Sequence, residues 1–225
     1  VARIICARPP APVLLFDSCS LLDIIRALSR KNPNHIHAAV RLIAELAANP
    51  GRIHLIVAEF VPLEVADNMP AAKDDLESEL NRIDAAYSNL AQALSNTHLG
   101  AIPLLVYPRE TLVDEIGSLP EKLLKLATKL DRDLDCVERA LTRLIAKQRP
   151  SHNKEIKDSI IFEQYLELTR QLRAGGFQQR CILVSSDKNA FGAGRIHPDL
   201  EPEIRPPLNL EYYSSLGAAM GSLGL

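Results

Sequence analysis

Three short apolar runs, each followed by polar residues, constrain the fold of this chain most strongly. They are Val13–Phe16, residues 53–58 and Cys181–Val184. Because they lack polar alternation, they are typical of strands buried on both faces of a parallel sheet. Helical patterns separate them, and a strand, helix, strand order over this distance favours a right-handed parallel crossover. We therefore expect an α/β fold around a central parallel sheet.

The segments between these strands carry helical periodicity. Ser20 is a suitable N-cap for a helix over residues 21–30. Apolar residues then recur at helical spacing over residues 36–47, which predicts a second helix. A further helix is expected over residues 156–172, since a glycine pair follows it closely. The tail from Pro202 shows no strong period, and the pattern assigns it no structure.

The middle of the chain predicts two long amphipathic helices, over residues 71–96 and 119–147. Between them, residues 104–107 form a short apolar run that we predict to be a third strand. We expect residues 71–150 to be a helical insertion in a single domain that covers 1–225. The apolar faces of these helices could pack on a partner protein or on a second copy of the chain as a homodimer.

Composition places the chain among ordinary globular proteins. With 225 residues, 47% of them hydrophobic, it can bury one sizeable core without disulfides. No apolar run approaches the roughly 18 residues of a membrane span, so we expect no membrane association. Residues 1–12 lack the apolar core of a secretory signal and are predicted to be a lead-in to the first strand. The cysteines have no close spacing, which predicts reduced thiols in a cytoplasmic protein: Cys6, Cys19, Cys136 and Cys181.

Two of the apolar runs lead into an aspartate. Asp17 follows the first run directly, and Asp187 follows the last run after two serines. Since loops after the strands of a parallel sheet form the ligand crevice, both carboxylates should project into one site. Each residue taken alone is also a common helix cap or turn residue, so a purely structural role is the alternative.

Two further carboxylates complete the candidate set. Asp158 lies in the first turn of the helix predicted over residues 156–172, where stabilisation of the helix dipole is the alternative role. Glu59 and Glu64 both follow the second strand, and either could supply the fourth group. Four converging carboxylates repel one another, so the site requires cations, and oxygen ligands select Mg²⁺ or Mn²⁺. A pair of such ions fits phosphodiester hydrolysis best.

The order of these motifs resembles the PIN domain family. A strand ending in Asp is followed by an apolar segment with a downstream Glu, then by Lys-Asp-Ser-Ile-Ile on a helix, then by Val-Ser-Ser-Asp-Lys-Asn-Ala-Phe. The closest likeness is to a PIN-like branch with Glu in a Val-x-x-x-Val-x-x-Glu context and a last strand reading Ser-Ser-(Asn or Asp)-x-x-x-Phe. The resemblance covers about residues 12–70 and 152–200. It implies a three-layer α/β/α sandwich and metal-dependent endonuclease cleavage of single-stranded or structured RNA.

The resemblance also assigns residues to the site. Carried over by position, the metal-binding acids of the family fall on Asp17, Glu64, Asp158 and Asp187. Glu64 is preferred to Glu59 because it follows Val61 by three residues, as the family pattern expects. Ser185 matches the hydroxyl that members place before the last acid. Asn189 stands where many members have another acid, which would weaken a second metal site.

A basic stretch leads into the helix predicted to carry Asp158. Residues 139–157 contain only Glu155 as an acid, and we take four of their cations as candidate nucleic-acid-binding residues: Arg143, Lys147, Arg149 and Lys154. Contacts of this kind with phosphates give affinity without sequence preference. The alternative is a solvated helix face. The net charge of -2 argues against a protein that coats nucleic acid over its whole surface.

Two other functions fit parts of the pattern. A binding or scaffold protein that keeps the fold without turnover would explain Asn189 and the long helical middle. A phosphatase with Asp17 as nucleophile fits less well, because haloacid-dehalogenase-like enzymes carry a second Asp two residues on, where this chain has Cys19. The sequence contains no Gly-rich phosphate loop, Gly-x-Ser-x-Gly elbow or His-Glu-x-x-His pattern.

Overall fold

A parallel sheet forms the centre of the computed structural model, which describes residues 1–97, 103, 106–151 and 155–225. Within these residues the sheet has five strands, all parallel, in the order β3-β2-β1-β4-β5. The expected α/β fold with a central parallel sheet is therefore confirmed. The strands are β1 (Val13–Phe16), β2 (His54–Val57), β3 (Thr128–Lys129), β4 (Cys181–Val184) and β5 (Leu210–Tyr213).

The inner strands end level with one another. β1 lies in the middle, and its register pairs Phe16 with Val57 of β2 and with Val184 of β4. Every residue of these three strands is buried, as expected for continuous apolar runs covered on both faces. Because the strands end level, the residues that follow β1, β2 and β4 emerge at the same edge of the sheet.

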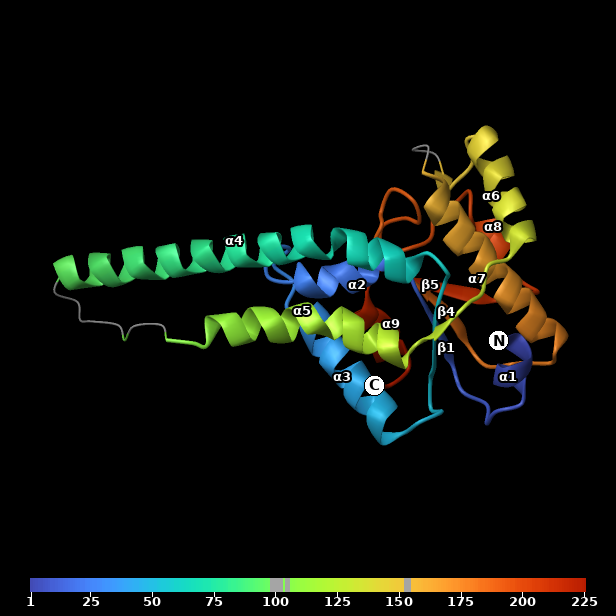
Figure 1. Cartoon of the computed structure of the whole chain (residues 1–225), viewed down its shortest axis with the longest axis horizontal. Coiled ribbons are helices and arrows are strands. Elements are labelled where there is room, and N and C mark those ends of the chain that lie inside the picture. The colour runs from blue at the N-terminus through green and yellow to red at the C-terminus, as the bar shows by residue number, and fades with distance from the viewer. Residues whose placement is uncertain (98–102, 104–105, 152–154) are drawn as a thin grey trace.

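Helices cover the sheet in two groups. Figure 1 shows one group on each side of β1, β4 and β5, an arrangement compatible with three layers. The first group is α7 (Ile156–Ala174) with α1 (Ala2–Cys6) and α6 (Leu134–Ile145), which both contact α7. The second group is α2 (Ser18–Ile25), α3 (Asn34–Ala48), α4 (Val61–Asn96), α5 (Arg109–Leu126) and α9 (Leu216–Ser222). The short α8 (Glu201–Ile204) precedes β5.

The beginning of the chain differs from the sequence prediction. Residues 1–12 are not a plain lead-in, because they contain α1, which packs on α7. α2 begins at Ser18 instead of residue 21, and its N-cap is Asp17 instead of Ser20. The Asp17 carboxylate accepts a hydrogen bond from the Ser18 N–H, so the helix starts directly after β1.

Both termini of the chain therefore add structure that the pattern did not assign. The tail beyond Pro202 supplies β5, which pairs with β4, and α9, which packs on α3. The helices predicted over residues 36–47 and 156–172 are confirmed as α3 and α7.

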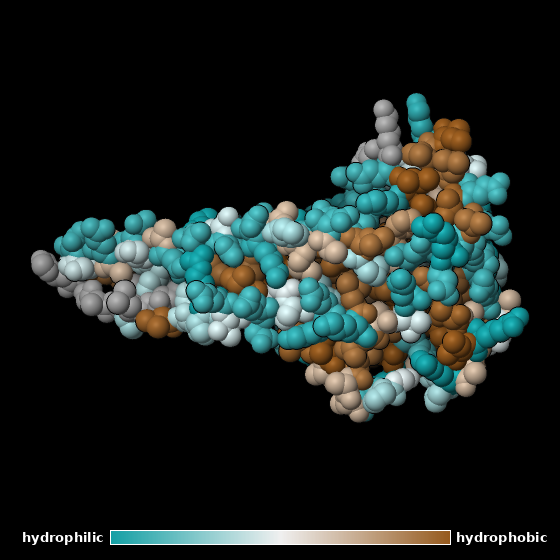
Figure 2. Space-filling model, viewed as in Figure 1, coloured by the Kyte–Doolittle hydropathy of each residue, from teal (hydrophilic) through white to brown (hydrophobic). Residues whose placement is uncertain are grey.

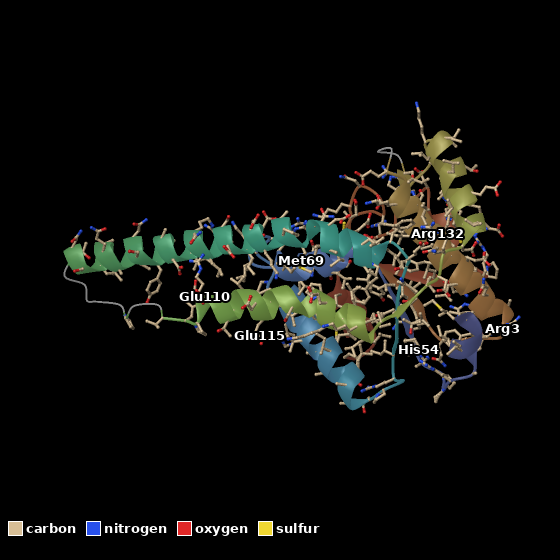
Figure 3. The ribbon with its side chains drawn as sticks, viewed as in Figure 1. Arg3, His54, Met69, Glu110, Glu115 and Arg132 are labelled. Atoms are coloured by element: carbon tan, nitrogen blue, oxygen red, sulfur yellow. The ribbon has the colours of Figure 1, made fainter. Side chains whose placement is uncertain are left out.

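α4 is longer than predicted, because it is not interrupted at Pro70. The sequence pattern placed its start after this proline, whereas the helix begins at Val61. Burial of one continuous face on both sides of Pro70 outweighs the hydrogen bond that the proline removes. Figure 3 labels one residue of this face, Met69. The buried residues of the helix are Val61, Val65, Met69, Ala72, Leu76 and Leu80.

The helix predicted over residues 119–147 is wrong as a single element. α5 ends at Leu126, β3 then pairs with β2 at the sheet edge, and α6 begins only at Leu134. Of the third strand predicted over residues 104–107, residues 104 and 105 lie outside the described residues, and Val106 and Tyr107 are not in a strand. Residues 71–150 are thus not a purely helical insertion, since they also contribute an edge strand.

Candidate functional site

Asp17 stands at the first position after β1 and is 1% exposed. Its Oδ1 accepts a hydrogen bond from the Ser18 N–H at 2.8 Å, and its Oδ2 accepts one from the Ser185 hydroxyl at 2.6 Å. The pKa of Asp17 is raised to about 7, chiefly by burial and also by the charges of Glu64 and Asp187, against the opposing effect of the Ser185 hydrogen bond. The carboxylate is therefore held firmly and kept partly protonated at neutral pH.

Asp187 stands on the loop after β4, next to the strand that leads to Asp17. Its Oδ1 accepts hydrogen bonds from the N–H groups of Asn189 and Ala190, both at 2.8 Å. The Asp187 N–H donates to the Ser185 Oγ at 3.2 Å, so this hydroxyl connects the two aspartates. The structural roles considered from the sequence, cap and turn, are both present, and they fix the carboxylates at one edge of the sheet.

Glu64 joins this edge from the first turn of α4. Its Oε2 accepts a hydrogen bond from the Ser18 hydroxyl at 2.8 Å, and Lys157 Nζ lies 3.8 Å from its Oε1. Burial raises the pKa of Glu64, although Ser18 and Lys157 counteract it. Glu59 instead pairs with Arg132 at 2.8 Å. Of the two glutamates, Glu64 is therefore the one that lies with the aspartates.

Asp158 completes the group from the first turn of α7. Burial, and after it the charges of Asp17, Glu64 and Asp187, together raise its pKa to about 8. Such coupling requires that the four carboxylates lie within electrostatic reach of one another. The structure thus brings together carboxylates from four segments that are far apart in the sequence.

Two hydroxyl residues of this region were not assigned a role from the sequence. The Ser18 hydroxyl donates a hydrogen bond to Glu64, and the only sequence feature that pointed to this role was the position of Ser18 beside Asp17. The Tyr165 hydroxyl accepts a hydrogen bond from the Ala58 N–H at 2.9 Å and donates one to the Phe16 carbonyl. Tyr165 thereby joins the ends of β1 and β2 to α7. The sequence feature that could have identified Tyr165 was a tyrosine on an apolar helix face, because the hydroxyl of a buried tyrosine needs a hydrogen-bond partner.

The donor chemistry of the four carboxylates suits a hard cation, because all of their ligand atoms are oxygens. Their arrangement does not form a coordination shell in this structure. Among residues 1–97, 103, 106–151 and 155–225, no three His, Cys, Asp or Glu side chains are grouped so that they could hold an ion. Several oxygens are instead occupied by the hydrogen bonds of Ser18, Ser185 and the Asp187 turn. The site is an electrostatically coupled acidic cluster whose oxygens would have to turn toward an ion.

The prediction that Arg143 binds nucleic acid is wrong in this structure. Its side chain is 10% exposed and pairs with Glu163 at 2.5 Å and with Glu203 through two nitrogens. A guanidinium held by two carboxylates inside the protein has no free edge for a phosphate. The reason is that α6 turns this position toward α7, which the one-dimensional sequence could not reveal.

The other basic candidates have different surroundings. Lys147 is exposed just beyond the end of α6. Arg149 donates a hydrogen bond to the carbonyl of Asn189, on the loop that carries Asp187, and also lies 3.7 Å from Asp199. Lys154 lies outside the described residues. A cavity of about 540 Å³ beside Lys147 and Arg149 is lined by both cations and acids.

Comparisons with known proteins add no relative to this picture. No family model, no curated protein and no solved structure matches this chain. In the described part of the chain, every helix is too short or too polar to cross a lipid bilayer. The acidic cluster and its surroundings are therefore the features that bear on function, since a fold by itself does not define an activity.

Proposed function

We propose that the chain is a Mg²⁺- or Mn²⁺-dependent endoribonuclease on a PIN-like, three-layer α/β/α sandwich. The observation that carries the proposal is the burial of carboxylates that also feel one another's charge: burial first, and then the charges of neighbouring carboxylates, raise the pKa of Asp17 to about 7 and that of Asp158 to about 8. A cluster of this kind gains most from a divalent cation, because the ion removes both the repulsion and the need for protons.

The residues around the cluster support hydrolysis of a phosphodiester. Bound cations would supply an activated water and stabilise the leaving oxygen. Ser18 and Ser185 orient Glu64 and Asp17 through hydrogen bonds of 2.8 and 2.6 Å. Lys147 and Arg149 are the described cations that we assign to the RNA backbone, and Lys154 belongs to the same proposal. All four cysteines are free thiols, which fits the reducing cytoplasm in which we place the protein.

The experiment measures Mn²⁺ binding by calorimetry and cleavage of generic RNA by the full chain. Asp17→Asn is the decisive variant, because asparagine caps a helix about as well as aspartate and should leave α2 intact. We expect its cleavage rate to fall at least about 100-fold, since even groups that only support metal ligands contribute about 10- to 100-fold. The matched control is Asp114→Asn, an exposed aspartate on α5, which should leave both readouts unchanged.

Two results would overturn the nuclease proposal. One is cleavage that continues after all divalent ions have been chelated. The other is full activity in Asp17→Asn while the Asp114→Asn control behaves normally.

A catalytically inactive scaffold is the second candidate function. The specific observation that favours it is the Lys157 ammonium, 3.8 Å from Glu64, which already offsets part of the negative charge of the cluster. Asn189, at a position where the resemblance leads us to expect an acid, points the same way. Calorimetry separates the two, because a scaffold should give no heat of binding at millimolar Mg²⁺ or Mn²⁺.

A further inference from the structure

A cavity lies at the carboxyl edge of the sheet, next to the acidic cluster. It has a volume of about 460 Å³, and the loop after β4 lines it with Ser186 and Lys188, which stand on either side of Asp187. Ser214 and Ser215 line it from the next strand, because they directly follow β5. Ligands of parallel sheets bind outside the carboxyl ends of the strands, in cavities where a few polar groups converge.

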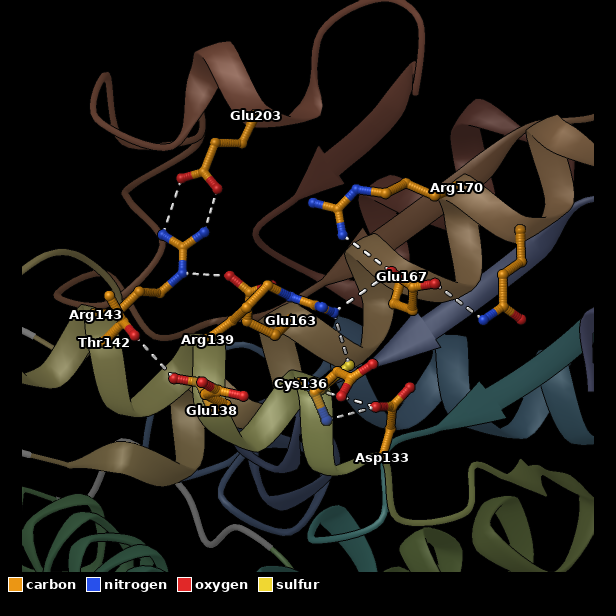
Figure 4. Close-up of polar contacts among 12 residues, drawn as sticks. Asp133, Cys136, Glu138, Arg139, Thr142, Arg143, Glu163, Glu167, Arg170 and Glu203 are labelled. Atoms are coloured by element: carbon orange, nitrogen blue, oxygen red, sulfur yellow. Dashed lines mark hydrogen bonds and ion pairs between the residues drawn. The ribbon is translucent and has the colours of Figure 1, made fainter.

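Two cations line this cavity, and both can reach a ligand. Lys188 is exposed on the loop after β4. Arg30 follows α2, and its side chain is 48% exposed. Its Nη1 pairs with Asp23, and the structure records no further partner for this guanidinium among the described residues. The guanidinium of Arg143, by contrast, is enclosed by two carboxylates (Figure 4).

The other charged and titratable groups leave the cavity with a positive balance. Among the described residues that line it, Asp23 is the only acid, and Arg30 offsets its charge. His35 is 7% exposed, and burial lowers the pKa of its imidazole against the opposing charge of Asp23, so the ring is neutral at pH 7. Its Nε2 accepts a hydrogen bond from the Asn32 amide at 3.0 Å. Lys188 therefore supplies the excess positive charge.

Serine hydroxyls add hydrogen-bond donors to the cavity. The Oγ of Ser186 is buried and has no hydrogen-bond partner in the described part of the chain. A buried hydroxyl without a partner costs free energy, so it favours a ligand that accepts a hydrogen bond. The Oγ of Ser215 accepts a hydrogen bond from the Ala218 N–H at 3.2 Å, which leaves its own proton for a ligand.

We infer that this cavity binds a phosphate group of an RNA strand whose neighbouring phosphodiester lies at the acidic cluster. A phosphate is an anion with several acceptor oxygens, which matches cations and hydroxyl donors. The choice of RNA as its source rests on the proposed function. Figure 2 shows a largely hydrophilic surface along α4, and the charged residues of that helix are mainly acidic. Arg30 and Lys188, and not α4, therefore hold the strand.

The experiment measures the binding of a fluorescently labelled uridine hexanucleotide by anisotropy. Every protein carries Asp17→Asn, so that the RNA is not cleaved. Lys188→Met should raise the dissociation constant about tenfold, because a charge-assisted hydrogen bond is lost. It should also lower the slope of log affinity against log salt concentration by about 0.7, the value for one phosphate contact with a single strand. The matched control is Lys125→Met, an exposed lysine of α5 outside the cavity, which should change neither quantity.

The variant Ser186→Ala tests the buried hydroxyl. Because this hydroxyl has no partner in the free protein, its removal should leave the free energy of unfolding unchanged or raise it. The dissociation constant for the hexanucleotide should nevertheless rise about threefold or more. An unchanged dissociation constant in both Ser186→Ala and Lys188→Met would overturn the inference.

Uncharged linkages locate the contact along the strand. One phosphate at a time is replaced by a methylphosphonate, and at the phosphate held in the cavity this change should weaken binding by the chain that retains Lys188, with no further loss in Lys188→Met. Equal coupling at every linkage would overturn the inference, because it indicates general attraction. Calorimetric binding of inorganic phosphate together with unchanged RNA affinity in Lys188→Met would also overturn it, since the cavity would then hold a free anion. Coupling at one linkage in a chain whose wild type never cleaves RNA would refute the nuclease and support the phosphate cavity.

Discussion

Individual carboxylates determine the pH dependence that we expect of the metal-free protein. The ordinary pKa of both Asp17 and Asp158 is 3.8, and folding raises it to about 7 and about 8. A raised pKa means that the folded state holds its proton more tightly than the unfolded state does. The stability contributed by these protons is therefore complete below about pH 4 and is lost as the pH rises through 7 to 8.

The variant Asp158→Asn isolates this effect, because asparagine does not titrate. In chelator, we expect the free energy of unfolding of the wild-type chain to fall relative to that of the variant by about 2 to 4 kcal/mol from pH 4 to pH 8. Urea unfolding at a series of pH values measures the difference. Saturating Mn²⁺ should abolish the fall if the carboxylates share an ion. Parallel stability curves for the two proteins would contradict the prediction.

At the scale of elements, the contact between α6 and α7 depends on ion pairs. The Glu163 side chain is 3% exposed and pairs with both Arg139 and Arg143. Glu163→Gln removes the carboxylate that these two guanidinium groups share, which leaves Arg143 only Glu203 and Arg139 only Glu167, and loss of a buried partner is destabilising. We expect the free energy of unfolding to fall by about 2 kcal/mol or more, measured by urea unfolding.

An exposed ion pair provides the control for this element. Glu115, labelled in Figure 3, pairs with Lys122 at 3.1 Å, and the two side chains are 67% and 45% exposed. Water screens such a pair, so Glu115→Gln should change stability by less than about 1 kcal/mol. Equal effects of Glu163→Gln and Glu115→Gln would show that α6 is not held in the way we describe.

At the scale of the whole molecule, α4 extends beyond the core that holds its first half. Its buried residues end at Leu80, and residues 81–96 contain none. Figure 1 shows α4 and α5 leaving the sheet side by side, with the far end of α4 beyond α5. A helix without a buried face has little tertiary stabilisation and opens locally.

Hydrogen exchange along this one helix tests the description. We expect amides of residues 65–80 to exchange at least about 100-fold more slowly than those of residues 88–96, because only the former require the core to open. Mass spectrometry of peptides from the two halves measures the ratio, and no substitution is needed. Uniform protection along α4 would contradict the prediction and indicate a partner on its outer half.

Sequence patterns predicted the parts of the fold that depend on local burial. The continuous apolar runs predicted β1, β2 and β4, and helical periodicity predicted α3 and α7, because a buried strand or an amphipathic helix shows its surroundings in its own residues. The same reasoning placed Asp17 and Asp187 at one edge, since strand ends in a parallel sheet lie together.

Features that depend on distant partners were decided only by the tertiary structure. α4 continues through Pro70 because a face built from both sides of it is buried, and β3 forms where β2 offers an unpaired edge. The Arg143 side chain points into the protein because it forms ion pairs with Glu163 and Glu203, although its sequence context is that of an exposed basic helix. In each case the stabilising contacts come from residues far away in the chain. The sequence alone determined the elements that show their own burial, which are β1, β2, β4, α3 and α7. The packing decided where elements end, which further segments such as β3 and β5 join the sheet, and which side chains meet.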